Sequence, residues 1–201
     1  MNFLAHIYLS FGDDEITLGN FIADSIRGNK FKHLPKPVQE GILLHREIDT
    51  FTDTHPIPKK SSKKLHKNYS HYSRVIVDIF YDHFLAKNWM AYSEEPLPDF
   101  VDKFYDLLED NYQILPDGVK RMMPYMLSDN WLVNYANLQG IGKVLNGMNR
   151  RTKNKSKMNF AIIDLEEHYV AFEAEFTEFF EELTVFARER FLAIRPDSHV
   201  S

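Results

Sequence analysis

The strongest constraint on the fold is a helical repeat of apolar residues in the C-terminal part of the chain. Between Phe160 and Ile194, apolar side chains recur mostly at steps of three and four residues, the spacing of one face of an α-helix. This pattern predicts a long helix, and a break within it stays open. Nowhere does the sequence alternate between apolar and polar residues for long enough to form a strand, and it contains no glycine-rich phosphate loop. The sequence therefore predicts an all-α fold.

Shorter helical patterns precede this one and are separated by glycine, proline and polar turns. We predict helices at about residues 1–10, 16–27, 37–54, 59–67, 71–90, 99–115 and 134–149, with a further helix opening at Pro116. The 201 residues fit one helical domain, 1–201, in which residues 150–157 form a polar loop and residues 196–201 a disordered tail.

The composition excludes several kinds of site. With 44% hydrophobic residues the chain can bury a core, and without cysteine it has no disulfide, thiolate nucleophile or cysteine-based zinc site. A net charge of −5 does not indicate a nucleic-acid-binding protein. The first residues lack the pattern of a signal peptide, and no apolar run is long enough to span a membrane. We expect a cytoplasmic protein, whose oligomeric state the sequence does not specify.

Two basic runs stand out on this acidic chain. Either run could be a solvated surface or a docking site for an anionic partner. The first run comprises Lys59, Lys60, Lys63, Lys64 and Lys67, and the second comprises Arg150, Arg151, Lys153, Lys155 and Lys157.

The helix predicted from about Pro37 carries polar residues where its apolar stripe should continue. Val38 and Ile42 are followed on the same stripe by His45 and Asp49, four residues apart. Burying an unpaired charge costs several kcal/mol. A cation would satisfy these side chains, although a surface ion pair would show the same spacing.

The helix predicted over residues 71–90 has the same anomaly, because Asp78 and Asp82 interrupt its apolar face and His83 adjoins the second. Imidazole and carboxylate ligands from several helices suit Mn, Fe, Zn or Mg, with Mg alone the least favoured. The candidate ligands are Asp24, His45, Asp49, Asp53, His55, Asp78, Asp82 and His83. Three histidines are interpreted as structural or surface residues: His6, His66 and His71.

Four segments taken together resemble the acyl carrier protein phosphodiesterase family. They are Met-Asn-Phe-Leu-Ala-His-Ile-Tyr-Leu-Ser at residues 1–10, Gly-Asn-Phe-Ile-Ala-Asp at 19–24, the segment from His45 to Pro56, and Asp78-x-x-x-Asp82-His83-Phe84-Leu85. The order and spacing of these motifs match the family over about the first 90 residues.

This resemblance implies an HD-domain-like helical bundle and a hydrolase that uses a divalent metal, Mn being favoured. The reaction would remove 4′-phosphopantetheine from the serine of holo-acyl carrier protein. The two basic runs would then dock this acidic partner. The sequence has the order Asp82-His83 instead of the His-Asp dipeptide of HD proteins, so the ligand scheme of those proteins is not transferred position for position.

The resemblance also suggests roles for individual residues. The metal ligands would come from Asp24, His45, Asp49, Asp53, Asp78 and Asp82. The catalytic residues would be His83, His55 and Asp82, with either histidine protonating the leaving serine oxygen. Arg46 would hold the phosphate or face outward.

Two other functions fit the same residues. One is an HD-like hydrolase of a small nucleotide or another phosphodiester. The other is a non-catalytic helical module that binds an acidic protein through its basic runs, with the inward-facing acids and histidines forming buried ion pairs.

Overall fold

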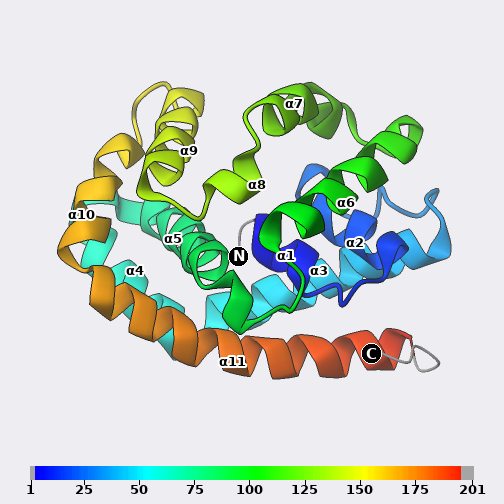
Figure 1. The fold of residues 1–201 in the computed structure, drawn as a ribbon, viewed down its shortest axis with the longest axis horizontal. Helices are drawn as coiled ribbons and strands as arrows, with labels where there is room; N and C mark the ends of the chain where they lie inside the picture. The colour runs from blue at the N-terminus through cyan, green and yellow to red at the C-terminus, as the bar shows by residue number, and fades with distance from the viewer. Residues whose placement is uncertain (1–2, 196–201) are drawn as a thin grey trace.

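The computed structural model describes residues 3–195 and confirms the all-α prediction, since no strand occurs in that range (Figure 1). The predicted tail at 196–201 lies outside the described residues. The α-helices are α1 (Phe3–Tyr8), α2 (Asp14–Ile22), α3 (Lys36–Thr54), α4 (Pro56–Tyr69), α5 (Ser73–Lys87), α6 (Leu97–Asp110), α7 (Asp117–Ser128), α8 (Trp131–Asn134), α9 (Leu138–Arg151), α10 (Ala161–Glu167) and α11 (Tyr169–Ile194).

Several helix boundaries differ from the prediction for local reasons. Helix α4 begins at Pro56, not at Lys59, because proline is well suited to the first turn of a helix. The Nδ1 atom of His55 accepts a hydrogen bond from the backbone N–H of Ile57 and so caps the same turn. The C-terminal helical pattern is broken at His168, where α10 ends and α11 begins one residue later.

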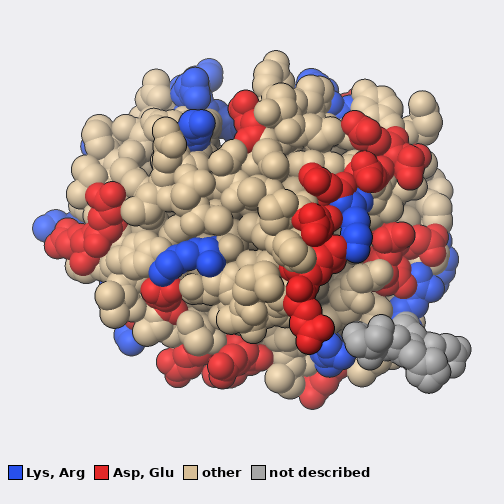
Figure 2. Space-filling model, in the orientation of Figure 1, with Lys and Arg blue, Asp and Glu red and all other residues tan. Residues whose placement is uncertain are grey.

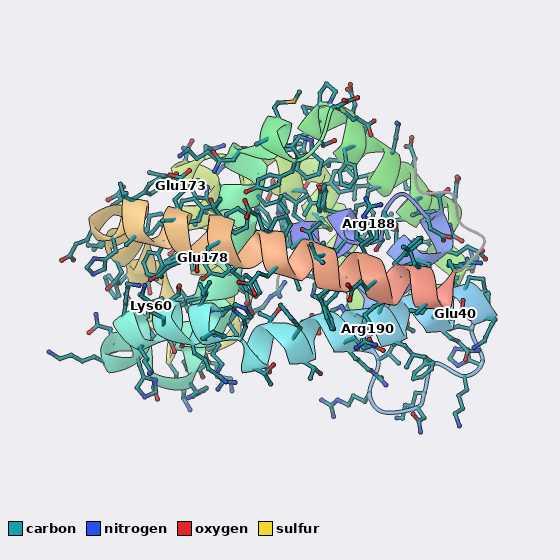
Figure 3. The ribbon with its side chains drawn as sticks, turned by 90° about the horizontal axis from the view of Figure 1, so that it is seen from below. Glu40, Lys60, Glu173, Glu178, Arg188 and Arg190 are labelled. Carbon is teal, nitrogen blue, oxygen red and sulfur yellow. The ribbon has the colours of Figure 1, made fainter. Side chains whose placement is uncertain are left out.

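Helix α11 runs along one side of the molecule and packs against α3, α4 and α5 (Figure 3). Its buried apolar residues are Phe172, Phe176, Phe179, Phe180, Leu183, Ala187 and Phe191. On its outer side, Arg190 Nε lies 3.1 Å from Glu47 Oε2 of α3. Within residues 3–195, no helix is long and apolar enough to cross a membrane.

Helices α2 and α3 approach each other closely at two glycines. A Cβ atom on Gly19 would lie 2.1 Å from the carbonyl oxygen of Val38, and one on Gly41 would lie 2.3 Å from the carbonyl oxygen of Ile16. Backbone contact at this crossing is therefore possible only without side chains. It brings the last turn of α2 against the middle of α3, where His45 is located.

We expect Gly41→Ala to destabilise the protein by about 2–3 kcal/mol, because the methyl group forces two backbones apart. Gly142→Ala on α9 is the matched control, since a Cβ there meets no atom within 4 Å. That change should stabilise the protein by up to about 1 kcal/mol, as usual for glycine in a helix. Urea unfolding of both variants checks the prediction, and equal effects would contradict it.

Candidate active site

Three side chains from two helices converge beside the crossing of α2 and α3. The ligand atoms of His6 on α1 and of His45 and Asp49 on α3 all lie within 4.8 Å of one another. His45 Nε2 is 3.1 Å from Asp49 Oδ2, and His6 Nε2 is 3.2 Å from Asp49 Oδ1. The two imidazole rings are stacked, with centroids 3.9 Å apart. This cluster has the donors of a metal site.

The orientation of both rings is set by hydrogen bonds at Nδ1. His6 Nδ1 lies 2.8 Å from Asn20 Oδ1, and His45 Nδ1 lies 2.8 Å from the carbonyl oxygen of Asn20. Metal-ligating histidines usually donate their second N–H to such an oxygen. Apart from its 3.2 Å contact with Asp49 Oδ1, the buried Nε2 atom of His6 has no hydrogen-bond partner among the described residues. A metal ion at this position would satisfy it, so the residues fit a divalent cation.

Burial and charge shift the pKa values of the cluster strongly. Burial lowers the pKa of His45, but its hydrogen bonds to Asp24 and Asp49 outweigh this and raise the pKa to about 9. Burial and the neighbouring charge of His45 lower the pKa of His6 to about 4. Burial alone would raise the pKa of Asp49, yet its hydrogen bonds to both histidines hold it far below its usual range. The cluster therefore holds its carboxylate ionised and His6 neutral near neutral pH.

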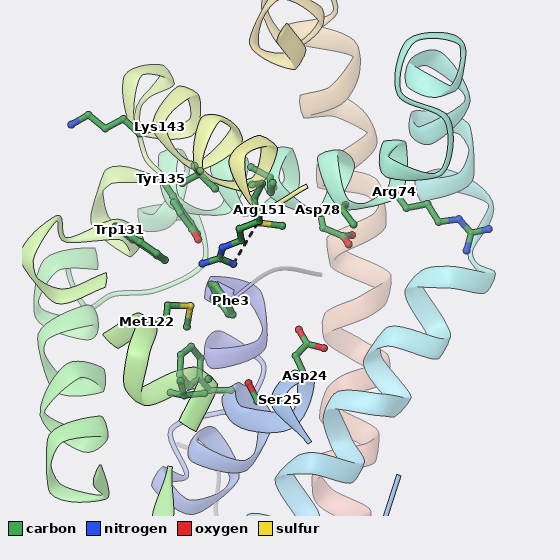
Figure 4. Close-up of a pocket in the computed structure, with 18 of the residues that line it drawn as sticks. Phe3, Asp24, Ser25, Arg74, Asp78, Met122, Trp131, Tyr135, Lys143 and Arg151 are labelled. Carbon is green, nitrogen blue, oxygen red and sulfur yellow. Dashed lines mark hydrogen bonds between the residues drawn. The ribbon is translucent and has the colours of Figure 1, made fainter. Parts of the chain in front are cut away.

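Two further carboxylates face the cluster. Asp24 Oδ1 lies 3.2 Å from His45 Nε2, and this hydrogen bond lowers the pKa of Asp24. Asp78 on α5 is half-buried, and burial raises the pKa of its carboxyl group. Figure 4 shows Asp24 and Asp78 pointing toward the same space from opposite sides.

Asp82 is fully buried one turn beyond Asp78 and contacts the start of α1 instead of the cluster. Its Oδ2 accepts a hydrogen bond of 2.8 Å from the backbone N–H of Leu4, and its Oδ1 accepts one of 3.2 Å from Ala5. Burial raises the pKa of Asp82 to about 7. Asp82 thus caps the helix that carries His6.

The other predicted site residues lie apart from the cluster. His83 Nδ1 contacts the carbonyl oxygen of Tyr135 at 2.7 Å, and His55 Nε2 is 3.2 Å from Glu182 Oε2. Asp53 forms an exposed pair with Arg74 at 3.4 Å, and both residues line the cavity beside the cluster. Arg46 donates a 2.6 Å hydrogen bond to the carbonyl oxygen of Gly28 on the surface.

A cavity of about 900 Å³ adjoins the cluster, and Asp24, Asp49 and Asp78 line it. Its apolar wall includes Phe3, Phe21, Val119, Met122, Trp131 and Val144. Its cationic side chains are Arg74, Lys143, Arg150 and Arg151. Arg151 at the end of α9 extends over Phe3 in the direction of Trp131 (Figure 4), and its guanidinium lies 3.7 Å from the sulfur of Met148.

The first basic run is divided between two sides of α4. Lys59 and Lys63 line a smaller cavity of about 500 Å³, which shares Asp78, Arg74 and other residues with the large one. Lys60 and Lys64 pair instead with the buried Glu175 of α11. Lys67 is exposed and lines neither cavity.

Sequence reasoning missed three residues of this site. It interpreted His6 as structural or surface, although the side chain is buried within the cluster. It assigned no role to Asn20, and it gave Arg151 only a docking role, although this exposed side chain also lines the cavity. His6 and Asn20 both stand in the motifs that carry the family resemblance, which was the available signal.

The fold and the site define a helical-bundle protein with a histidine–carboxylate centre at the edge of a cavity, an arrangement in which helical proteins bind metals. The model of the family described as acyl carrier protein phosphodiesterase matches residues 1–183. The chain belongs to this family, which confirms the resemblance seen in the sequence and the prediction of a phosphodiesterase enzyme.

Curated relatives cover nearly the whole chain. A protein named acyl carrier protein phosphodiesterase from Photorhabdus laumondii is 35% identical over 184 residues, which are 90% of this chain and 91% of the relative. Proteins of the same name from Enterobacter sp. (strain 638) and Yersinia pestis are 35% and 33% identical, over 94% and 90% of this chain and 99% and 94% of the relatives. No solved structure gives a significant match, so the predicted HD-domain-like relationship stays a prediction.

Proposed function

We propose that the protein is a metal-dependent hydrolase that removes 4′-phosphopantetheine from the serine of holo-acyl carrier protein. The observation that carries this proposal is the convergence of His6, His45 and Asp49 at the edge of a cavity of about 900 Å³. The relatives named for this activity, which span nearly the whole chain, support it.

Imidazole and carboxylate donors favour Mn²⁺, Fe²⁺ or Zn²⁺ over Mg²⁺, and we propose Mn²⁺ as the first metal to test. His6, His45 and Asp49 would hold the ion, with Asp24 next to His45 as a further ligand. A bound divalent cation lowers the pKa of its water and offsets charge that develops on a phosphoryl group.

Arg151 is the side chain best placed to bind the phosphate. Its guanidinium lies over Phe3 (Figure 4) in the cavity that Asp49 also lines, and arginine can donate two parallel hydrogen bonds to a phosphate group. Arg46, the residue predicted for this role, lies against Phe31 on the surface and does not line the cavity. The apolar wall around Trp131 and Met122 would receive the pantetheine arm.

Asp78 would protonate the serine oxygen as it leaves. Its pKa is raised by burial, as expected of a carboxyl group that holds a proton, and it lines the cavity. Neither His83 nor His55, the residues predicted for this step, lines the cavity. We expect Asp78→Asn to lower kcat about 100-fold with Mn²⁺ binding retained. Loss of Mn²⁺ binding in that variant would instead make Asp78 a ligand.

The reaction is tested by incubating the Mn²⁺-loaded protein with holo-acyl carrier protein and following the mass of the carrier. Loss of the phosphopantetheine mass with the wild type, and its retention with Asp49→Asn, would support the proposal. Cleavage of a small phosphodiester with an unchanged carrier mass would favour a small-molecule hydrolase instead. An unchanged mass and no bound Mn²⁺ would contradict the proposed chemistry.

The docking surface for an acidic carrier is expected on the cationic side of the two cavities. Acidic side chains gather over α6, on the face shown in Figure 2, where an acidic protein would be repelled. Lys59 and Lys63 line the smaller cavity, which shares Asp78 and Arg74 with the larger one, and this makes them the best-placed part of the first basic run.

We expect the double variant Lys59→Glu with Lys63→Glu to raise KM for the carrier about tenfold, with kcat nearly unchanged and a weaker salt dependence. Lys67→Glu is the matched control on the same helix, and its KM should change by less than about twofold. Steady-state kinetics at two salt concentrations measures both. Equal effects of the two substitutions would refute this placement of the carrier.

A further inference from the structure

Asn20 contacts both imidazoles of the cluster at their Nδ1 atoms. Its side-chain Oδ1 lies 2.8 Å from His6 Nδ1, and its main-chain oxygen lies 2.8 Å from His45 Nδ1. Asn20 is fully buried in the last turn of α2, where carbonyl groups have no partner within the helix. The contact with His45 therefore also supplies a hydrogen-bond partner to a carbonyl group at the end of this helix.

The neighbours of Asn20 fix the direction of its amide group. Asn20 Nδ2 lies 2.8 Å from the carbonyl oxygen of His6 and 3.1 Å from Ser10 Oγ. Because a carbonyl oxygen only accepts, the amide nitrogen must point toward it and the amide oxygen must face His6 Nδ1. His6 Nδ1 must then carry the proton, which leaves the lone pair of the neutral ring on Nε2.

The same reasoning applies to His45. The carbonyl oxygen of Asn20 can only accept, so His45 Nδ1 is the donor and its Nε2 faces Asp24 and Asp49. The close approach of α2 and α3 at Gly19 and Gly41 is what allows a main-chain oxygen of one helix to reach a ring on the other.

We propose that Asn20 is a positioning residue that fixes the Nδ1–H form of both histidines and thereby directs both Nε2 atoms toward Asp49 to bind the metal. The inference rests on the proposed metal centre. In this role Asn20 contacts neither the metal nor the substrate, yet it determines whether His6 and His45 can serve as ligands.

The test in the metal-free protein is nitrogen NMR of selectively ¹⁵N-histidine-labelled protein at neutral pH. We expect the wild-type His6 signal to show the Nδ1–H form. Asn20→Ala should lose it, and Asn20→Asp should retain it, because a carboxylate oxygen can still accept from Nδ1. Ser10→Ala is the control, since it disturbs the same buried hydrogen bonds without touching His6 Nδ1.

The second readout is Mn²⁺ binding by calorimetry, with Mn²⁺ alone as the ligand. Asn20→Ala should bind Mn²⁺ about 10- to 100-fold more weakly than the wild type, and Ser10→Ala should bind it almost as tightly. An Nε2–H form of His6 in the wild-type protein would overturn the inference even if Asn20→Ala does not fold. Unchanged Mn²⁺ affinity in folded Asn20→Ala would also overturn it.

These outcomes are separate from those of the proposed reaction. If the wild type binds Mn²⁺ and shows the Nδ1–H form but does not cleave the carrier, the reaction fails and the role of Asn20 stands. If the wild type binds no Mn²⁺, the metal centre and the role of Asn20 both fail.

Discussion

Replacing His6 with alanine is expected to lower kcat/KM by about 10³-fold or more, equivalent to about 4 kcal/mol of transition-state stabilisation. His6 supplies one of the three converging ligand atoms, and among the described residues its buried Nε2 contacts only Asp49, another proposed ligand. Without it, His45 and Asp49 would hold a divalent ion too weakly to keep it at the cavity. Mn²⁺ content after dialysis and steady-state kinetics on holo-acyl carrier protein measure the two effects.

The stability of the variant needs a control, because the His6 ring packs on His45. His6→Phe keeps an aromatic ring at this position but has no nitrogen, so it should fold and still lose Mn²⁺. His33→Ala removes an exposed histidine that lines neither cavity and should behave as the wild type. Stoichiometric Mn²⁺ in folded His6→Phe would show that the ion binds elsewhere.

The difference between His45 and His6 shows how far the sequence can predict this site. The four-residue spacing predicts that His45 and Asp49 share a helical face, and the structure confirms it with a 3.1 Å contact. His6 stands on a separate short helix, so its approach to His45 depends on how α1 packs against α2 and α5. No spacing within the sequence encodes that packing.

For the acids on α5 and the lysines on α4, the contact partners likewise depend on how the helices pack. The interrupted apolar stripe correctly predicts that Asp82 points inward, but its partners are backbone amides of α1, 78 and 77 residues away in the chain. The sequence of α4 does not reveal that Lys60 and Lys64 form ion pairs with Glu175, because these pairs depend on where α11 packs against α4. Helical content follows from local pattern, whereas partners follow from packing.

At about pH 4, where the carboxyl group is protonated in the folded protein, Asp82→Ala is expected to destabilise the protein by about 4 kcal/mol, one of the largest effects of any single substitution in this chain. The change leaves the N–H groups of Leu4 and Ala5 buried without their acceptor, at a cost of about 1–3 kcal/mol each. It also releases the start of α1, the helix that carries His6. Urea unfolding should show the loss of stability, and weaker Mn²⁺ binding should accompany it in the fraction that remains folded.

Asp82→Asn separates the charge of the carboxyl group from its shape. The amide keeps one oxygen acceptor and does not titrate. The unfolding free energy of the variant protein therefore lacks the pH dependence that Asp82 contributes to the wild type. Burial raises the pKa of Asp82 to about 7 in the folded protein, and its unfolded value is about 3.9. Between these values the folded state binds more protons than the unfolded state, so the contribution of Asp82 to stability falls as the pH rises.

The expected signature is a difference in unfolding free energy between wild type and Asp82→Asn that depends on pH. The wild type should lose up to about 4 kcal/mol relative to the variant from pH 4 to pH 7, which is about 3 pKa units at 1.36 kcal/mol each. Taking the difference removes the contributions of other groups, such as His6, whose lowered pKa makes the folded state more stable as the pH rises from about 4 to 6.5. A constant difference across this range would mean that Asp82 is ionised in the folded protein throughout. The two backbone hydrogen bonds at the start of α1 would then outweigh the cost of burying its charge.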